Sequence, residues 1–204
     1  MSLFARLAVA ALLCGGVAVA AHAETRTYAM DPNHTDIVVT WTHFGYSHPS
    51  AMFNHITGTI TYDPNDPSKD SVEATIPISS VHTASPALDE HLQGSDFFDA
   101  SKYPDVIFKS TKVTRGDGPD KLKVMGNLTV HGKTAPVTLD VTVNKAGINR
   151  GKHQVAFNAT TTLKRSDFGV DLYAPTVSDE VTLIMTTEAT ATEPDPEAPE
   201  PKGK

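Results

Sequence analysis

Alternation between apolar and polar residues, repeated in eight short segments, is the sequence feature that most restricts the fold. In the first segment Ile37, Val39 and Trp41 alternate with small or polar residues, so one face is large and apolar. Successive side chains of a β-strand point to opposite faces, and this period therefore predicts strands. The same period recurs in seven further segments, which are 53–62, 72–78, 106–108, 122–130, 137–143, 155–159 and 181–185.

Short turn signals separate several of these segments. Pro, Gly, Asn and Asp residues cluster at 63–67, 116–119, 131–133 and 149–151. Connections this short join antiparallel neighbours, whereas parallel strands need crossovers of roughly a dozen or more residues. The sequence therefore predicts an all-β domain of eight mainly antiparallel strands, and the pattern alone leaves a closed barrel and a sandwich both open.

One interval departs from the strand period and predicts a short helix. A Ser-Pro pair precedes a run of helix-forming residues and Gly94 follows it, which places the helix at 86–93. The next segment, 95–100, is compatible with one further helical turn. Its adjacent phenylalanines, Phe97 and Phe98, are expected to fold over the end of the sheet.

Both ends of the chain differ in composition from the strand-rich middle. Arg6, a following uncharged apolar run and the A-x-A pattern at 21–23 are typical of a secretory signal peptide, so we expect residues 1–23 to be removed. Residues 192–204 are rich in Pro and Glu and contain no large apolar side chain, which predicts a disordered tail. The folded domain then spans 24–191.

Charge and cysteine content argue against several functions. With 17 Lys and Arg against 24 Asp and Glu, a net charge of −7, the chain offers no basic face for nucleic acid. The only cysteine, Cys14, lies in the expected signal peptide, so the mature chain should contain no disulfide and no Cys-based metal site. No later apolar run reaches about 18 residues, so stable membrane insertion is not expected.

The histidines require metal binding and catalysis to be considered. Nine are present, and none forms an H-x-x-x-H or H-E-x-x-H pair. A lone inward-facing histidine is more often a hydrogen-bonded core residue than a ligand. No G-x-S-x-G motif is present, although a catalytic triad can also assemble from distant segments. We expect no metal, no cofactor and no catalytic residue, with a His-dependent metal-binding or enzymatic periplasmic stress protein as the alternative.

Several short strings occur in an order and spacing that together form a specific signal. They are DPNH at 31–34, HFG at 43–45, GTI at 58–60, HL at 91–92, DFFD at 96–99, YP at 103–104, FKS at 108–110, GNLTVHG at 126–132 and RSDFG at 165–169. Together they cover nearly all of 28–189, and they resemble the YceI-like family of exported, polyisoprenoid-binding, lipocalin-like proteins.

The resemblance implies a fold, a location and a ligand. It implies an eight-stranded antiparallel lipocalin-like barrel with a short helical excursion, secreted to the periplasm. It also implies non-catalytic binding or carriage of a long-chain isoprenoid, polyprenyl or quinone-like, or of a similar amphiphilic lipid. Ala51 departs from the family pattern, which tends to have glycine there, so we expect a difference in a local turn near the cavity mouth. The oligomeric state stays open, and an exposed barrel edge or mouth would allow a homodimer.

Two groups of residues are candidates for ligand binding. Residues of shared strand parity are expected to line a cavity: Ile37, Val39, Trp41, Ile76, Ile78, Val106, Phe108, Leu128, Leu139 and Phe157. Pattern alone favours a solid core made of these side chains, and the resemblance favours an open cavity. Residues expected at the mouth, near a polar head group, are His43, His91, Phe97, Phe98 and Arg165. The alternative for Arg165 is an ion pair with Asp167 or another carboxylate.

Overall fold

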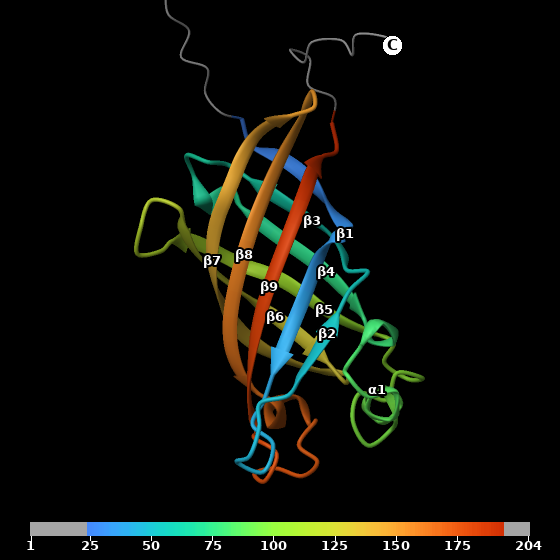
Figure 1. Cartoon of the computed structure of the whole chain (residues 1–204). Coiled ribbons are helices and arrows are strands. Elements are labelled where there is room, and N and C mark those ends of the chain that lie inside the picture. The colour runs from blue at the N-terminus through green and yellow to red at the C-terminus, as the bar shows by residue number, and fades with distance from the viewer. Residues whose placement is uncertain (1–23, 194–204) are drawn as a thin grey trace, which may run out of the picture.

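The computed structural model describes residues 24–193, which form a closed antiparallel β-barrel with one α-helix beside one end (Figure 1). The expected signal peptide, 1–23, and residues 194–204 of the expected tail lie outside the described residues. The strands are β1 (Arg26–Thr40), β2 (Ser50–Phe53), β3 (Thr57–Tyr62), β4 (Ser71–Pro77), β5 (Asp105–Arg115), β6 (Lys121–Val130), β7 (Lys133–Asn149), β8 (Lys152–Lys164) and β9 (Glu180–Ala191).

Pairing between the first and last strands closes the sheet into a barrel. From β3 to β9 each strand pairs antiparallel with its successor, and β9 then pairs with β1 from Tyr28–Ala191 to Thr40–Thr182. A bulge at 31–34 interrupts this last ladder, where Asp31 accepts hydrogen bonds from the backbone N–H of Asn33 and from the His34 ring. Among the described strands, closure leaves the short β2, which pairs with β1 alone, as the strand with a single strand neighbour, and the open choice between barrel and sandwich is settled in favour of the barrel.

β2 and β3 together fill one of eight strand positions. β3 pairs with residues 26–29 of β1, and β2 pairs with residues 37–40 on the same side of β1. The predicted eight-stranded barrel is therefore confirmed, but the single strand predicted at 53–62 is wrong, because the chain leaves the sheet at 54–56, where His55 has a φ of 55°. The turn expected around Ala51 is also wrong, since Ala51 lies in β2 opposite Val39.

Two of the predicted turns are tight hairpins. His131 and Gly132 have φ values of 50° and 72°, and Arg150 and Gly151 have 51° and 75°. Two successive residues with positive φ form the kind of two-residue turn whose twist matches that of the flanking strands. These turns fix the registers of β6–β7 and β7–β8, and most strands extend well beyond the segments that the alternation marked.

The helix α1 spans Pro86–Gln93, as predicted. The further helical turn expected at 95–100 is wrong, because this segment forms hydrogen-bonded turns in which the N–H groups of Phe97 and Asp99 both donate to the Gly94 carbonyl. These turns direct Phe98 against Phe53, with ring centroids 6.1 Å apart. Three short 3₁₀ turns complete the structure: Pro67–Lys69, Ile78–Ser80 and Arg165–Phe168.

The buried side chains gather in separate regions of the barrel. The largest cluster includes Tyr28, Tyr62 and Phe157 and lies toward the distal end, which we define as the end where β1 begins and β9 ends. A second cluster, around Ile56 and Ile78, lies near α1. Between these clusters the interior of the barrel is not filled by side chains, which creates the cavity described below.

A glycine on β6 gives the first test of this packing. Gly126 is buried, and a Cβ atom there would overlap the Phe108 ring and the Lys109 carbonyl oxygen. We predict that Gly126→Ala lowers the free energy of unfolding by about 1–3 kcal/mol through overpacking, measured by urea denaturation. Asn127→Ala, on the exposed side of the same strand, is the control and should change it by less than about 0.5 kcal/mol. Equal effects of the two substitutions would contradict the packing argument.

Candidate functional site

A cavity of about 760 Å³ occupies the barrel interior. All nine strands contribute apolar side chains to its wall, which runs from Val113 and Leu122 near the distal end to Trp41 and Leu92 near α1. The cavity is therefore elongated along the barrel. Its volume lies within the range of about 300–1,000 Å³ that is typical of ligand pockets.

Strand parity explains why the wall is apolar. On β7, Val137, Leu139 and Val141 line the cavity, while the intervening Thr138 and Asp140 are exposed on the outer face. The same wall residues also show that the interior is open. Leu139 is only half-buried although it points into the barrel, and Leu128 and Val39 are half-buried in the same way. In a solid core these side chains would pack against each other and lose their exposure.

Nine of the ten predicted wall residues line this cavity: Ile37, Val39, Trp41, Ile76, Val106, Phe108, Leu128, Leu139 and Phe157. Ile78 does not. It begins the 3₁₀ turn that follows β4, is 1% exposed and packs in the cluster near α1. The strand period continues into Ile78 in the sequence although the strand ends at Pro77, and this explains the error. That the nine contact a ligand stays a prediction.

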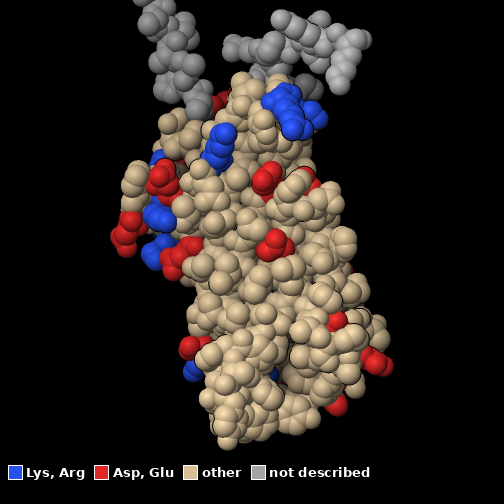
Figure 2. Space-filling view, viewed as in Figure 1, with Lys and Arg blue, Asp and Glu red and all other residues tan. Residues whose placement is uncertain are grey.

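Three segments border the end of the cavity near α1: 41–49, 86–104 and 165–177. We call this end the mouth, and Figure 2 shows a hollow between the segments there. The structure brings all five predicted mouth residues to it: His43, His91, Phe97, Phe98 and Arg165. The two histidines are exposed, and the His91 ring meets Phe97 edge-on with centroids 4.9 Å apart.

The Arg165 side chain is occupied by the chain itself. Its guanidinium donates to four backbone carbonyls, with distances of 2.9 Å to Ser178, 2.6 Å to Val170, 3.4 Å to Leu172 and 3.0 Å to Val177. The ion pair with a carboxylate considered as its alternative is therefore wrong. Arg165 holds the mouth segment 165–177 in place, and at most one of its five N–H donors is left for a head group.

A hydrogen-bonded carboxylate closes the distal end. Asp63 is 4% exposed and accepts hydrogen bonds from Thr25 Oγ1 at 2.7 Å, Lys69 Nζ at 2.9 Å and two backbone N–H groups of the following turn. These hydrogen bonds, first of all the one from Thr25, hold the pKa of Asp63 well below its usual range. The sequence predicted only a turn at 63–67. The several Asp residues in and after this turn could have indicated the hydrogen-bond network.

A second carboxyl, Asp70, reaches the cavity wall beside this network. Its Oδ1 accepts the backbone N–H of Asp63 at 2.7 Å, while its Oδ2 is buried without a hydrogen-bond partner in the described structure. Burial raises the pKa of Asp70 to about 6, because removal from water disfavours the charged form. The distal end therefore presents a carboxyl group that is neutral in mildly acidic solution.

The remaining polar groups do not assemble into a metal site. Among residues 24–193, no three His, Cys, Asp or Glu side chains lie close enough together to hold a metal ion. Individual histidines have local partners instead: His34 pairs with Asp31 at 2.8 Å, and the His131 ring stacks edge-on against Tyr103.

Comparison with known proteins identifies the barrel. The YceI-like domain matches residues 28–189. The chain belongs to the YceI-like family. A UPF0312 protein of Pseudomonas aeruginosa is 36% identical over 182 residues, which cover 87% of this chain and 91% of the relative.

Solved structures share the architecture of this YceI-like chain. The crystal structure of BcnA from Burkholderia cenocepacia aligns with a TM-score of 0.72 and 26% identity, covering 79% of this chain and 99% of BcnA. A polyisoprenoid binding domain from Saccharophagus degradans aligns with a TM-score of 0.63 and 12% identity, covering 80% of this chain and 98% of that domain. Within the described part of the YceI-like chain, no helix is both long and apolar enough to cross a membrane.

The role of Arg165 as a clamp can be tested by removing its donors. We predict that Arg165→Met lowers the free energy of unfolding by about 2–3 kcal/mol, because partly buried carbonyls lose charged donors. Arg165→Lys should recover little, since a single ammonium cannot replace the planar guanidinium fork. The measurements are urea denaturation and amide hydrogen exchange across 166–179, which should speed up. Unchanged exchange together with an altered head-group preference would show instead that Arg165 contacts the ligand.

The pKa of Asp70 predicts a specific pH dependence. Between about pH 4 and pH 6 the unfolded chain has released this proton while the folded protein retains it, so Asp70 makes the free energy of unfolding fall as pH rises through that window. Asp70→Asn should remove this fall, which we expect to be about 1–2 kcal/mol because the side chain is only partly buried. The measurement is the difference in unfolding free energy between variant and wild type at pH 4 and pH 7. A difference independent of pH would contradict the assignment.

Proposed function

We propose that this YceI-like protein binds and carries a long-chain isoprenoid, polyprenyl or quinone-like, in the cavity of its barrel, in the periplasm and without catalysis. The observation that carries the proposal is the elongated apolar cavity, in whose wall inward-facing residues such as Val39, Leu128 and Leu139 are only partly buried. The similarity in fold to the polyisoprenoid binding domain from Saccharophagus degradans supports it. The secretory signal expected at 1–23 supports the periplasmic location.

Burial of the ligand chain would provide the affinity. Transfer of a methylene group from water to an apolar site gains about 0.8 kcal/mol, so each buried isoprene unit contributes several times that amount. This gain exceeds the roughly 0.5–1.5 kcal/mol that ordering one flexible group costs. A ligand that extends along the whole cavity therefore binds better than a short one, and an isoprenoid has both the length and the apolar character that the wall accepts.

The mouth favours a head group without charge. Arg165 is the one Lys or Arg among the described wall residues, and four of its five N–H donors are engaged by backbone carbonyls. Recognition of a pyrophosphate normally needs several free cationic or backbone N–H donors. His43 and His91 are exposed at the mouth and can exchange hydrogen bonds with a carbonyl or hydroxyl group. A quinone or polyprenol head group suits this mouth better than a phosphorylated one.

Extraction of the purified protein tests the proposal. The mature chain, purified without denaturant and extracted with organic solvent, should release about one isoprenoid per chain, identified by mass spectrometry. An empty extract together with tightly bound zinc or copper in elemental analysis would contradict the proposal and favour the His-dependent alternative.

A substitution pair on β7 tests where the ligand lies. Leu139→Trp puts a large ring into the cavity, and displacing about two methylene groups of ligand costs about 1.6 kcal/mol, so retention should fall about tenfold or more. Thr138→Trp places the same side chain on the exposed face and should leave retention unchanged. Isoprenoid retained per folded chain after delipidation and reloading is the readout, with circular dichroism as the control for folding. Equal retention in both variants would show that the ligand does not occupy the barrel.

A further inference from the structure

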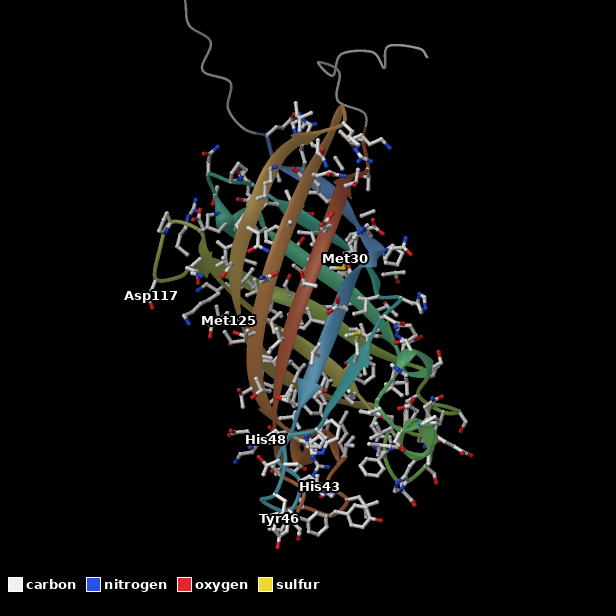
Figure 3. All side chains as sticks on the ribbon, in the orientation of Figure 1. Met30, His43, Tyr46, His48, Asp117 and Met125 are labelled. Carbon is white, nitrogen blue, oxygen red and sulfur yellow. The ribbon has the colours of Figure 1, made fainter. Side chains whose placement is uncertain are left out.

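Exposed aromatic side chains gather beyond the mouth. Tyr46 is 93% exposed, Tyr173 is 55% exposed and Phe44 is 49% exposed. They come from two of the segments that border the mouth, 41–49 and 165–177. Figure 3 shows Tyr46 at the extreme end of the molecule, beyond His43. We call these three side chains the aromatic tip.

Hydrogen bonds between the two segments hold the aromatic tip together. The Phe44 N–H donates to the Thr176 carbonyl at 2.9 Å, and His43 forms a β-bridge with Val177. Within the first segment the Tyr46 N–H donates to the His43 carbonyl at 3.0 Å. The aromatic side chains are thus presented on a braced structure, and their exposure cannot be attributed to a loose loop.

The aromatic tip is free of formal charge. Residues 41–49 contain no Lys, Arg, Asp or Glu, and neither do residues 172–178, although the exposed Asp171 directly precedes the second stretch. In Figure 2 the extremity of this end is tan, while acidic side chains appear on the neighbouring lobe and higher on the molecule. Contact of this extremity with a neutral bilayer would therefore remove little formal charge from water.

We propose that the aromatic tip docks the protein onto the interfacial region of a lipid bilayer, with the mouth facing the membrane. This inference rests on the proposed function, because it names the surface from which the isoprenoid enters the cavity. Tyr rings, with an apolar body and a polar hydroxyl, are enriched at the level of the lipid head groups. An uncharged aromatic surface of this kind binds neutral bilayers by burying apolar area.

The aromatic tip adjoins the cavity, so docking would let a ligand pass directly between the bilayer and the barrel. Phe97 lines the cavity and lies beside Tyr173, with ring centroids 6.5 Å apart, so apolar surface continues from the tip into the barrel. A long isoprenoid that moved between membrane and cavity through water would expose its whole chain, at about 0.8 kcal/mol per methylene group. Contact between tip and bilayer removes that exposed step.

The shape of the aromatic tip favours a membrane over a second copy of the chain. A stable protein interface buries about 800 Å² on each partner, which requires a broad complementary surface. The aromatic tip has only three exposed rings, and Figure 3 places Tyr46 among them at the extreme end of the molecule. A few aromatic side chains at such an end can insert among lipid head groups without any matching surface. Self-association through this end is therefore treated as an outcome that would overturn the inference.

Sedimentation with sucrose-loaded phosphatidylcholine vesicles provides the test, using the mature chain. Wild type should bind, and Tyr46→Ser should reduce the partition coefficient about tenfold, because one interfacial aromatic side chain is lost. Tyr46 packs against little, so the fold should be retained. Ile148→Ser is the matched control: Ile148 is 56% exposed on β7 near the distal end, and its loss should leave vesicle binding unchanged. Binding should also persist at high salt, since no charge pairing is involved.

Several results would overturn the inference. These are failure of wild type to bind vesicles, equal losses in Tyr46→Ser and Ile148→Ser, binding that requires anionic lipid and disappears in salt, or a dimer in size-exclusion chromatography that Tyr46→Ser dissolves. Isoprenoid content of the same preparations separates this inference from the proposed function. Protein that carries isoprenoid but does not bind vesicles would refute only the proposed docking. Protein that contains no isoprenoid but binds vesicles through Tyr46 would refute only the proposed ligand.

Discussion

Pairing of β9 with β1 is the constraint on which the rest of the structure depends. Once the sheet closes with eight strand positions, the inward-facing side chains point at each other across a fixed width. Aliphatic residues such as Val39 and Leu139 are too short to meet across that width, and a cavity remains. The cavity is thus a geometric consequence of closure combined with mid-sized wall residues. Larger inward residues, such as Tyr62 and Phe157 near the distal end, fill the barrel where they occur.

Hydrogen bonds of one charged side chain stabilise each end of the barrel. At the distal end, Asp63 gathers donors from Thr25 and Lys69 and ties the start of β1 to the turn after β3. At the mouth, Arg165 donates to backbone carbonyls and fixes a segment that lies between β8 and β9 and belongs to neither strand. One ionised side chain therefore organises each end. The segments at the distal end are tied together as a result, and the mouth keeps its shape without being filled.

The sequence predicted the parts of this structure that follow from local periodicity. Strand parity identified the wall residues, and glycine-containing turns such as His131-Gly132 located the hairpins. The helix after Ser85 was also predictable from its proline start. The errors arose where tertiary contacts decide. Ile78 continues the alternation but lies beyond the end of β4. The strand predicted at 53–62 breaks at His55 because β2 and β3 pair with two separate stretches of β1.

The polar parts of the site were harder to predict than the apolar wall. Arg165 donates to carbonyls between five and thirteen residues away in a segment without regular structure, and no spacing rule encodes that geometry. The raised pKa of Asp70 depends on burial behind a turn that itself depends on Asp63. Such groups become visible only when the fold has brought distant segments together. Apolar periodicity therefore identifies the cavity wall from the sequence, whereas the polar contacts at the two ends of the barrel do not follow from it.

An unfilled cavity also ties the stability of the barrel to its cargo. Wall residues that face empty space lose the dispersion contacts that a packed core would supply, which lowers the stability of the ligand-free protein. A ligand that binds only the folded barrel restores those contacts and raises stability by mass action. The barrel can tolerate the open interior because the ladders from β3 to β9 and from β9 to β1 and back to β3 pair the backbone around the barrel without a core. The sheet thus maintains the fold in the absence of ligand, and the isoprenoid proposed as the ligand would act, once bound, as the central part of the hydrophobic core.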